Sequence, residues 1–201
     1  YQDLNKKIFN KKLSFNRMIK KNLQLVYSQI SKRFVKNEDA LIINTYLPFL
    51  EEKKLEMALG QFPQIWINNP PEINVKPDQI LRKNLSSQLM FNSENELEGI
   101  IKQLIFELLP VYYLEAQKDL KKIINIQNWP KTPRFIFTSN NFYMDEVFKL
   151  WTAIKVESGS KYYIGQHGNN YFTTKNLFPR VEEKTSDKFF TWGWTNGLSK
   201  Y

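Results

Sequence analysis

The chain has 201 residues, of which 42% are hydrophobic and 15% aromatic, and its formal net charge is +9. The hydrophobic content is enough for a packed core, which argues against a disordered chain. The absence of cysteine and the single histidine disfavour disulfide frameworks and zinc sites, so we expect no metal and no other cofactor.

Two further absences bear on location. No apolar run approaches the ~18 residues of a membrane-spanning helix, and no signal-peptide pattern is visible. The cytoplasm is therefore the expected compartment. Because the chain starts at Tyr1 and stops at Tyr201, we also expect it to be a piece of a longer protein.

The positive charge is concentrated at the start of the chain. Residues 1–36 contain ten Lys/Arg and one acid, whereas the remaining residues balance to zero. Apolar residues recur at helical spacing over residues 4–34. They indicate either a core-facing stripe beneath a solvated charged face, or a surface that meets anionic lipid head groups or polyphosphate. The segment lacks nucleic-acid-binding signatures, so nucleic acid is not expected as a partner.

The middle of the chain alternates short strands with helices. Strands are predicted at residues 40–44 and 64–67, a helix over 49–59 that stops at Gly60, and a loop over 68–80. Ser93 and Glu96 fit a capping box that opens a long helix, which Pro110 should end. A second helix is predicted over residues 111–125.

The last third predicts a parallel crossover. A strand over 134–139, a helix over 143–157 and a strand over 162–165 form a strand–helix–strand unit. Another strand is predicted over 188–192, after a loop at 168–186. We expect an α/β fold, a Rossmann-like parallel sheet with a helical elaboration. The domains would be a basic amphipathic helical segment, residues 1–36, and a Rossmann-like domain, residues 37–201.

His167 is the strongest candidate for a catalytic residue. It follows a predicted strand, lies between Gly165 and Gly168, and has Gln166 and Asn169 beside it. Open α/β sheets present their chemistry at the carboxyl ends of strands. His167 is therefore interpreted as a general acid or base, or as a donor to a phosphate or sugar oxygen; a structural histidine is the alternative.

Polar residues near the other strand ends extend this candidate site. Ser139 and Asn140 follow the preceding strand, where they can bind an anion or a sugar hydroxyl or simply form a turn. A carboxylate among Glu182, Glu183 and Asp187 can act as a base, orient His167 or be solvated. Trp192 and Trp194 can belong to the core or stack on a sugar ring, and Tyr171 can be a hydrogen-bond donor or a core residue. Walker A and dinucleotide-binding motifs are absent.

These blocks resemble the transferases of bacterial O-antigen and surface-polysaccharide loci. The resemblance rests on Thr138-Ser139-Asn140, Asp145 to Trp151, Gly165-Gln166-His167-Gly168, Tyr171, Glu182-Glu183, Asp187, Phe190 and Trp192-Gly193-Trp194, over roughly residues 110–195. Residues 1–109 carry no motif that matches.

The resemblance implies a glycosyltransferase of the GT-B type, of which this chain would be much of the N-terminal half. The implied partners are a nucleotide-sugar donor and a glycan or lipid-linked acceptor. Separately, the basic charge of residues 1–36 suits a peripheral contact with the anionic inner face of the cytoplasmic membrane. The alternative is a non-enzymatic α/β module that binds anionic membrane or polymer through its basic helix. We expect His167, Glu183 and Asp187 to be catalytic. The expected substrate-binding residues are Ser139, Asn140, Gln166, Gly168, Asn169, Tyr171 and Trp194.

Overall fold

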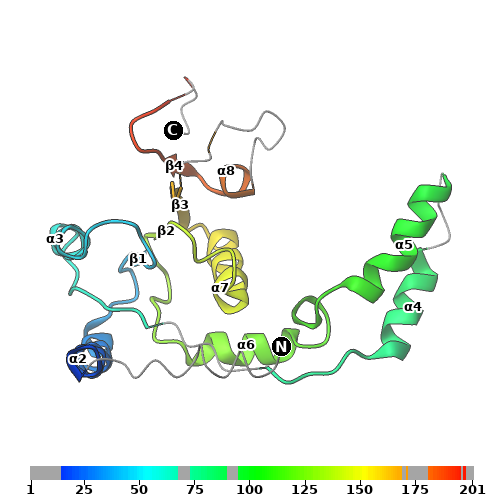
Figure 1. The fold of residues 1–201 in the computed structure, drawn as a ribbon, viewed down its shortest axis with the longest axis horizontal. Helices are drawn as coiled ribbons and strands as arrows, with labels where there is room; N and C mark the ends of the chain where they lie inside the picture. Colours follow the sequence, from blue (N-terminus) through cyan, green and yellow to red (C-terminus); the bar gives the residue numbers. More distant parts are fainter. Residues whose placement is uncertain are drawn as a thin grey trace.

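Figure 1 shows the computed structural model, which describes residues 15–67, 73–89, 95–168, 171, 181–195 and 197. Its centre is a four-stranded sheet in the order β1-β2-β3-β4. The strands are β1 (Leu41–Ile42), β2 (Phe135–Thr138), β3 (Lys161–Gly165) and β4 (Lys188–Phe190). All three pairings are parallel. The predicted Rossmann-like α/β fold is confirmed.

The strand–helix–strand unit is present as predicted. Helix α7 (Glu146–Glu157) joins β2 to β3 and buries Val147, Phe148 and Trp151. The Asp145 carboxylate caps its first turn by accepting a 2.9 Å hydrogen bond from the Phe148 amide. Gly159, with φ of +98°, lets the chain leave the helix in the left-handed conformation that disfavours a side chain. The core therefore lies between this helix and the sheet.

The remaining helices flank the sheet or extend from it. They are α2 (Phe15–Ser31) with the 3-10 turn η1 (Lys32–Phe34), α3 (Phe49–Ala58), α4 (Gln79–Leu89), α5 (Glu96–Leu108), the 3-10 turn η3 (Val111–Tyr113), α6 (Gln117–Ile126) and α8 (Val181–Thr185). The predicted helices over 49–59 and before Pro110 are confirmed. The one predicted over 111–125 is divided into η3 and α6, and α8 lies in the predicted 168–186 loop.

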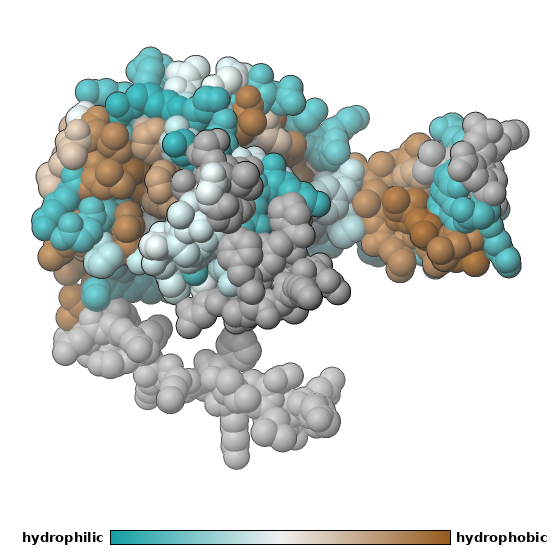
Figure 2. Space-filling view, turned by 90° about the horizontal axis from the view of Figure 1, so that it is seen from above, coloured by the Kyte–Doolittle hydropathy of each residue, from teal (hydrophilic) through white to brown (hydrophobic). Residues whose placement is uncertain are grey.

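Helices α4 and α5 form a hairpin that extends away from the sheet (Figure 1). Its surface carries apolar side chains, which Figure 2 shows in brown at the right of the molecule. The exposed residues are Ile80, Leu81, Leu97, Ile100, Ile101, Leu104, Ile105 and Leu108. The hairpin thus leaves apolar surface of both helices in contact with solvent.

Arg82 fixes the base of this hairpin. Its Nη1 donates to the carbonyl oxygens of Phe106 and Leu109 at 2.6 and 2.8 Å, at the end of α5. Its Nε and Nη2 donate to Glu115 at 2.6 and 2.8 Å. Through this hydrogen bonding, Arg82 lowers the pKa of Glu115 to about 2. One guanidinium therefore ties α4 to the end of α5 and to the segment that leads into α6.

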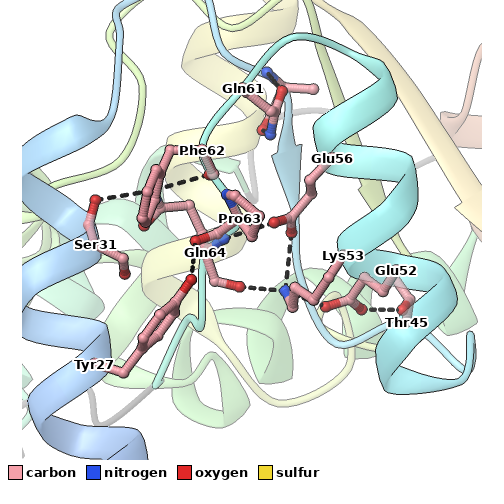
Figure 3. Close-up of polar contacts among 11 residues, drawn as sticks. Tyr27, Ser31, Thr45, Glu52, Lys53, Glu56, Gln61, Phe62, Pro63 and Gln64 are labelled. Carbon is pink, nitrogen blue, oxygen red and sulfur yellow. Dashed lines mark hydrogen bonds and ion pairs between the residues drawn. The ribbon is translucent and has the colours of Figure 1, made fainter.

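A buried polar network joins α3 to α2 (Figure 3). The Lys53 ammonium donates to Glu52 at 2.7 Å, to Glu56 at 3.0 Å and to the Gln64 carbonyl. Glu56 also accepts a 2.6 Å hydrogen bond from the Gln64 amide, and Gln64 Nε2 donates to the Ser31 carbonyl at 2.9 Å. Burial raises the pKa of Glu56. The network holds α2 and α3 together through Gln64, in the segment that follows α3.

Two predictions from the sequence, the strand at residues 64–67 and the helix cap at Ser93, are wrong. Residues 64–67 form no strand, because Gln64 uses its backbone in the network with Glu56 and Lys53. Asn95, not Ser93, is the N-cap of α5 and accepts a 2.8 Å hydrogen bond from the Glu98 amide; Ser93 itself lies outside the described residues.

The apolar stripe of α2 does not face the core. Ile19, Leu23, Val26 and Ile30 are all exposed. The buried positions of this helix are instead small and polar, at Ser28 and Ser31. The interpretation of residues 4–34 as a core-facing stripe is therefore wrong for the described residues of α2.

Candidate functional site

Polar side chains gather where the strands end. Because the four strands are parallel, the loops after them meet at one edge of the sheet, here called the carboxyl edge. The Ser139 amide donates to the Asn44 carbonyl at 3.1 Å, and the side chains of Asn44 and Asn141 are hydrogen-bonded. Asn141 Nδ2 donates to Asp145 at 3.1 Å. The ends of β1 and β2 are thus joined by polar side chains to the start of α7.

His167 lies at this edge, in the loop after β3. Its Nε2 is 2.9 Å from the Tyr143 hydroxyl and 3.8 Å from Glu182 Oε1. The imidazole packs edge-on against Tyr143 and Tyr171, with ring centroids 5.1 and 5.6 Å away. The His167 side chain is 22% exposed. The ring is therefore held by aromatic neighbours but remains open to solvent on one side.

Glu182 is the acidic partner of this histidine. Its side chain is only 4% exposed and lies in the first turn of α8. Glu182 Oε1 accepts hydrogen bonds from Tyr171 at 2.9 Å and from Tyr143 at 3.4 Å. Glu183, the expected catalytic carboxylate, is the next residue of α8 and is also buried. The carboxylate that reaches the His167–Tyr143 pair is that of Glu182.

Gln166 shapes the loop that carries His167. Its Oε1 accepts hydrogen bonds from the Trp192 amide at 2.9 Å and from Trp194 Nε1 at 2.8 Å. Its Nε2 donates to the Gly168 carbonyl at 2.7 Å. Both ends of the buried amide therefore contact protein groups, and Gln166 positions the histidine loop against the segment that follows β4.

The other expected substrate-binding residues differ in accessibility. Ser139 is buried, and a Cβ at Gly165 would lie 2.7 Å from its Oγ, so the close approach of β2 and β3 requires glycine there. A Cβ at Gly168 would meet open space. Asn140 is half-buried and donates to Tyr46 at 3.4 Å.

The two aromatic residues of that set are tied to the cluster. Tyr171 is buried, and its ring centroid is 6.3 Å from that of Trp194. Trp194 is half-buried and packs its ring 6.2 Å from that of Phe189 in the core. Asn169 lies outside the described residues.

Asp187 lies away from His167, at the opposite edge of the sheet. It precedes β4, where its carboxylate accepts hydrogen bonds from Lys161 Nζ and the Tyr162 amide, both at 2.9 Å. Lys161 and Tyr162 begin β3, whereas His167 follows its end. The structure thus separates Asp187 from His167 by the length of the strand, and Asp187 holds the beginnings of β3 and β4 together.

A hollow of about 270 Å³ opens at the carboxyl edge beside the end of β1. Asn44, Thr45, Glu52 and Trp66 line part of it, and the Lys53 network supports its wall. Figure 3 shows Thr45 and Glu52 hydrogen-bonded to each other beside Lys53. The carboxyl edge therefore combines an imidazole–carboxylate cluster after β3 with a small polar and aromatic hollow after β1.

A family model described as "LIC12162 family transferase" matches residues 1–200. The chain belongs to the LIC12162 transferase family. The match includes residues 1–109, where the sequence analysis found no recognisable motif. No curated protein and no solved structure matches the chain.

Two negative findings apply to the described part of this LIC12162 family chain. None of its helices is both long enough and apolar enough to cross a membrane. Nor do three or more histidine and acidic side chains come together there as metal ligands would.

The sequence did not indicate that Tyr143 contacts His167, and it favoured Glu183 over Glu182 as the carboxylate of the site. Tyr143 is 24 residues before His167, in the turn before α7, so no short motif links the two. Glu182 and Glu183 are adjacent glutamates, and only the orientation of α8 determines which of them faces His167. The parallel order of β2 and β3 does predict that His167 lies near the residues that follow β2.

Proposed function

We propose that this LIC12162 family transferase moves a sugar from a nucleotide-activated donor to a hydroxyl group of a surface-polysaccharide or O-antigen acceptor. The observation that carries the proposal is the contact of His167 with Tyr143 and Glu182 at the carboxyl edge of a parallel sheet. An imidazole with a buried carboxylate behind it is suited to accept a proton from a hydroxyl group. The resemblance in the sequence supports a sugar as the transferred group.

In this proposal the two ring nitrogens of His167 have different roles. The Tyr143 hydroxyl donates a hydrogen bond to Glu182, and its oxygen accepts one from an N–H at His167 Nε2. That tautomer leaves Nδ1 as the basic atom. Nδ1 takes the proton of the acceptor hydroxyl. The acceptor oxygen bonds to the anomeric carbon of the donor sugar, and the bond from that carbon to the phosphate of the nucleotide breaks. The Glu182 charge, 3.8 Å from Nε2, stabilises the resulting imidazolium.

The hollow after β1 supplies a place for a sugar ring. Trp66 offers an aromatic surface, while Asn44 and Glu52 offer hydrogen-bonding groups. Such a combination suits a polyhydroxylated ring, which has apolar faces and polar edges. In this proposal the sheet is the first half of a GT-B fold, and a second half supplies most contacts to the donor nucleotide.

The exposed face of α2 supports a contact with anionic membrane. Leu23, Val26 and Ile30 are more than half exposed, and Lys20 and Lys21 lie on the same helix. An amphipathic helix with lysines beside an apolar stripe can lie in the head-group region of a bilayer. Peripheral binding there would bring the carboxyl edge to lipid-linked acceptors.

Turnover of nucleotide sugars by the complete natural protein tests the catalytic part. With a panel of nucleotide sugars and lipid-linked acceptors, release of the nucleoside diphosphate is measured for His167→Ala. We expect a fall in kcat of about 100-fold or more, as for loss of a general base. Glu182→Gln and Tyr143→Phe should lower kcat by about tenfold with little change in KM, since the base remains but loses its orientation.

Tyr27→Phe is the matched control, because Tyr27 also loses a hydrogen bond, to the Pro63 carbonyl, but lies on α2. Its rate should equal that of the wild type. A His167→Ala protein that transfers at the wild-type rate would refute the catalytic assignment and leave the non-enzymatic binding module as the better description.

A further inference from the structure

A second hollow, of about 430 Å³, lies on the side of the sheet where the strands begin, here called the amino edge. It is formed by η1 and the loop after it, by the connection from α6 to β2, and by the last turns of α7. Four lysines line it, together with four side-chain amides: Lys32, Lys36, Lys131, Lys155, Asn37, Asn125, Gln127 and Asn128. None of the described residues that line it carries a carboxylate.

The four lysines of this lysine hollow differ from lysines elsewhere in the described part of the chain. Lysines elsewhere pair with acids: Lys53 with Glu52 and Glu56, Lys149 with Glu146, and Lys161 with Asp187. Among the described residues, none of the four hollow lysines forms an ion pair with a carboxylate. Bringing like charges together from separate segments costs free energy, and a bound anion removes that cost.

The walls of the lysine hollow are held in place without a ligand. Trp129 and Trp151 are buried, with ring centroids 5.1 Å apart, and Lys155 lies over the Trp151 ring. The Thr132 amide donates to the Asn37 carbonyl at 2.9 Å, which joins the loop before β1 to the loop before β2. The hollow is therefore a preformed recess with a tryptophan floor and a rim of cations and amides.

We propose that the lysine hollow binds an anion that carries phosphate groups and at least two negative charges. Ammonium and amide groups together suit phosphate oxygens, since each supplies N–H donors and the lysines supply charge. The volume is in the range of small-molecule sites. The ligand is either a soluble di- or polyphosphate or the head group of an anionic lipid. The site lies across the sheet from His167 and does not depend on the proposed glycosyl transfer.

Pyrophosphate is the soluble probe, and vesicles of equimolar phosphatidylcholine and phosphatidylglycerol are the lipid probe. The tryptophans of the hollow report pyrophosphate binding by fluorescence, and calorimetry gives the stoichiometry. The K36Q/K131Q double variant removes two exposed cations of the rim. The K83Q/K118Q double variant removes the same charge from exposed lysines outside the hollow. Thermal melting checks that both variants fold.

We expect one pyrophosphate per chain, bound at least tenfold more weakly by K36Q/K131Q and less than twofold more weakly by K83Q/K118Q. A second supporting result is that the wild type binds vesicles and not pyrophosphate. If K36Q/K131Q then loses vesicle binding and K83Q/K118Q retains it, the lipid head group is identified as the source of the phosphate. Equal behaviour of the two variants in both arms, or no binding of either probe by the wild type, would overturn the proposal.

Discussion

The apolar side chains of the helix that covers the sheet are buried, whereas those of the α4–α5 hairpin are exposed. Helix α7 buries Val147, Phe148 and Trp151 against the sheet, whereas the apolar stripe of α5 is exposed, up to 73% at Leu108. Many side chains share the stabilisation of the sheet. The hairpin, in contrast, is joined to the rest of the chain largely through Arg82 and Glu115. Substitutions in the sheet should therefore lower the stability of the whole sheet region, whereas substitutions at Arg82 or Glu115 should loosen the hairpin alone.

Loss of the Gln166 side chain is expected to have the largest effect on the stability of the sheet region. Gln166→Ala removes the hydrogen bonds that this side chain makes with the Trp194 indole N–H, the Trp192 amide and the Gly168 carbonyl. Each part-buried hydrogen bond contributes about 1 kcal/mol, so we expect the free energy of unfolding to fall by about 3 kcal/mol. Urea denaturation followed by tryptophan fluorescence measures it.

Asn140→Ala is the control for this prediction. It removes an amide that makes only a long hydrogen bond to Tyr46 and should change the free energy of unfolding by less than about 0.5 kcal/mol. If the two variants have the same stability, the histidine loop is not held by Gln166.

Gly165, the last residue of β3, and Gly168, in the loop that follows, should differ when each is replaced by alanine. At Gly165 the added Cβ would lie 2.7 Å from Ser139 Oγ and 3.2 Å from the Phe137 ring, so these side chains or the strands that carry them must move. We expect Gly165→Ala to cost about 1–3 kcal/mol, as overpacking does. Gly168→Ala meets open space and should be nearly neutral. Thermal melting distinguishes the two, and an equal shift in Tm would contradict the packing of Ser139 on Gly165.

Acid should act on the hairpin before it acts on the sheet. Arg82 lowers the pKa of Glu115 from its usual 4.5 to about 2, so the charged carboxylate stabilises the folded hairpin above pH 4.5. This stabilisation is lost as the pH falls from about 4.5 towards about 2. Hydrogen exchange should therefore show amides of α4 and α5 losing protection in that range ahead of those of β2 and β3.

Glu115→Gln gives the matched control for the acid experiment. The variant cannot lose a charge at this position, so its hairpin should be less protected at neutral pH and should lack the step between pH 4.5 and 2. Simultaneous loss of protection in hairpin and sheet would show that the two regions unfold together.

The sequence predicts the sheet well because a strand–helix–strand unit is encoded within a short stretch. The run Phe135–Thr138, the stripe of α7 and Gly159 each have a local signature, and a parallel sheet then brings the residues after β2 and β3 to one edge. Asp187 could also have been placed at the other edge from order alone, since it precedes its strand.

Partners across the fold were not predictable in the same way. Helical spacing in α2 and α5 defines an apolar face but does not say whether anything covers it, and both faces are exposed. Tyr143 meets His167 through the turn before α7, which no motif describes. Glu182 rather than Glu183 reaches the imidazole because of the orientation of α8, a helix of five residues that has little periodicity to detect.

The connection between β1 and β2 affects how the chain can assemble. Strands β2, β3 and β4 lie within residues 135–190, so they can pair soon after that stretch collapses. Strand β1 pairs with β2 only after the chain has brought together groups as far apart as Asn37 and Thr132, 95 residues from each other. Contacts of such sequence separation form slowly because loop closure precedes their stabilisation. Helices α3 to α6 lie in this loop, and β1 should therefore be the last strand to join the sheet during refolding.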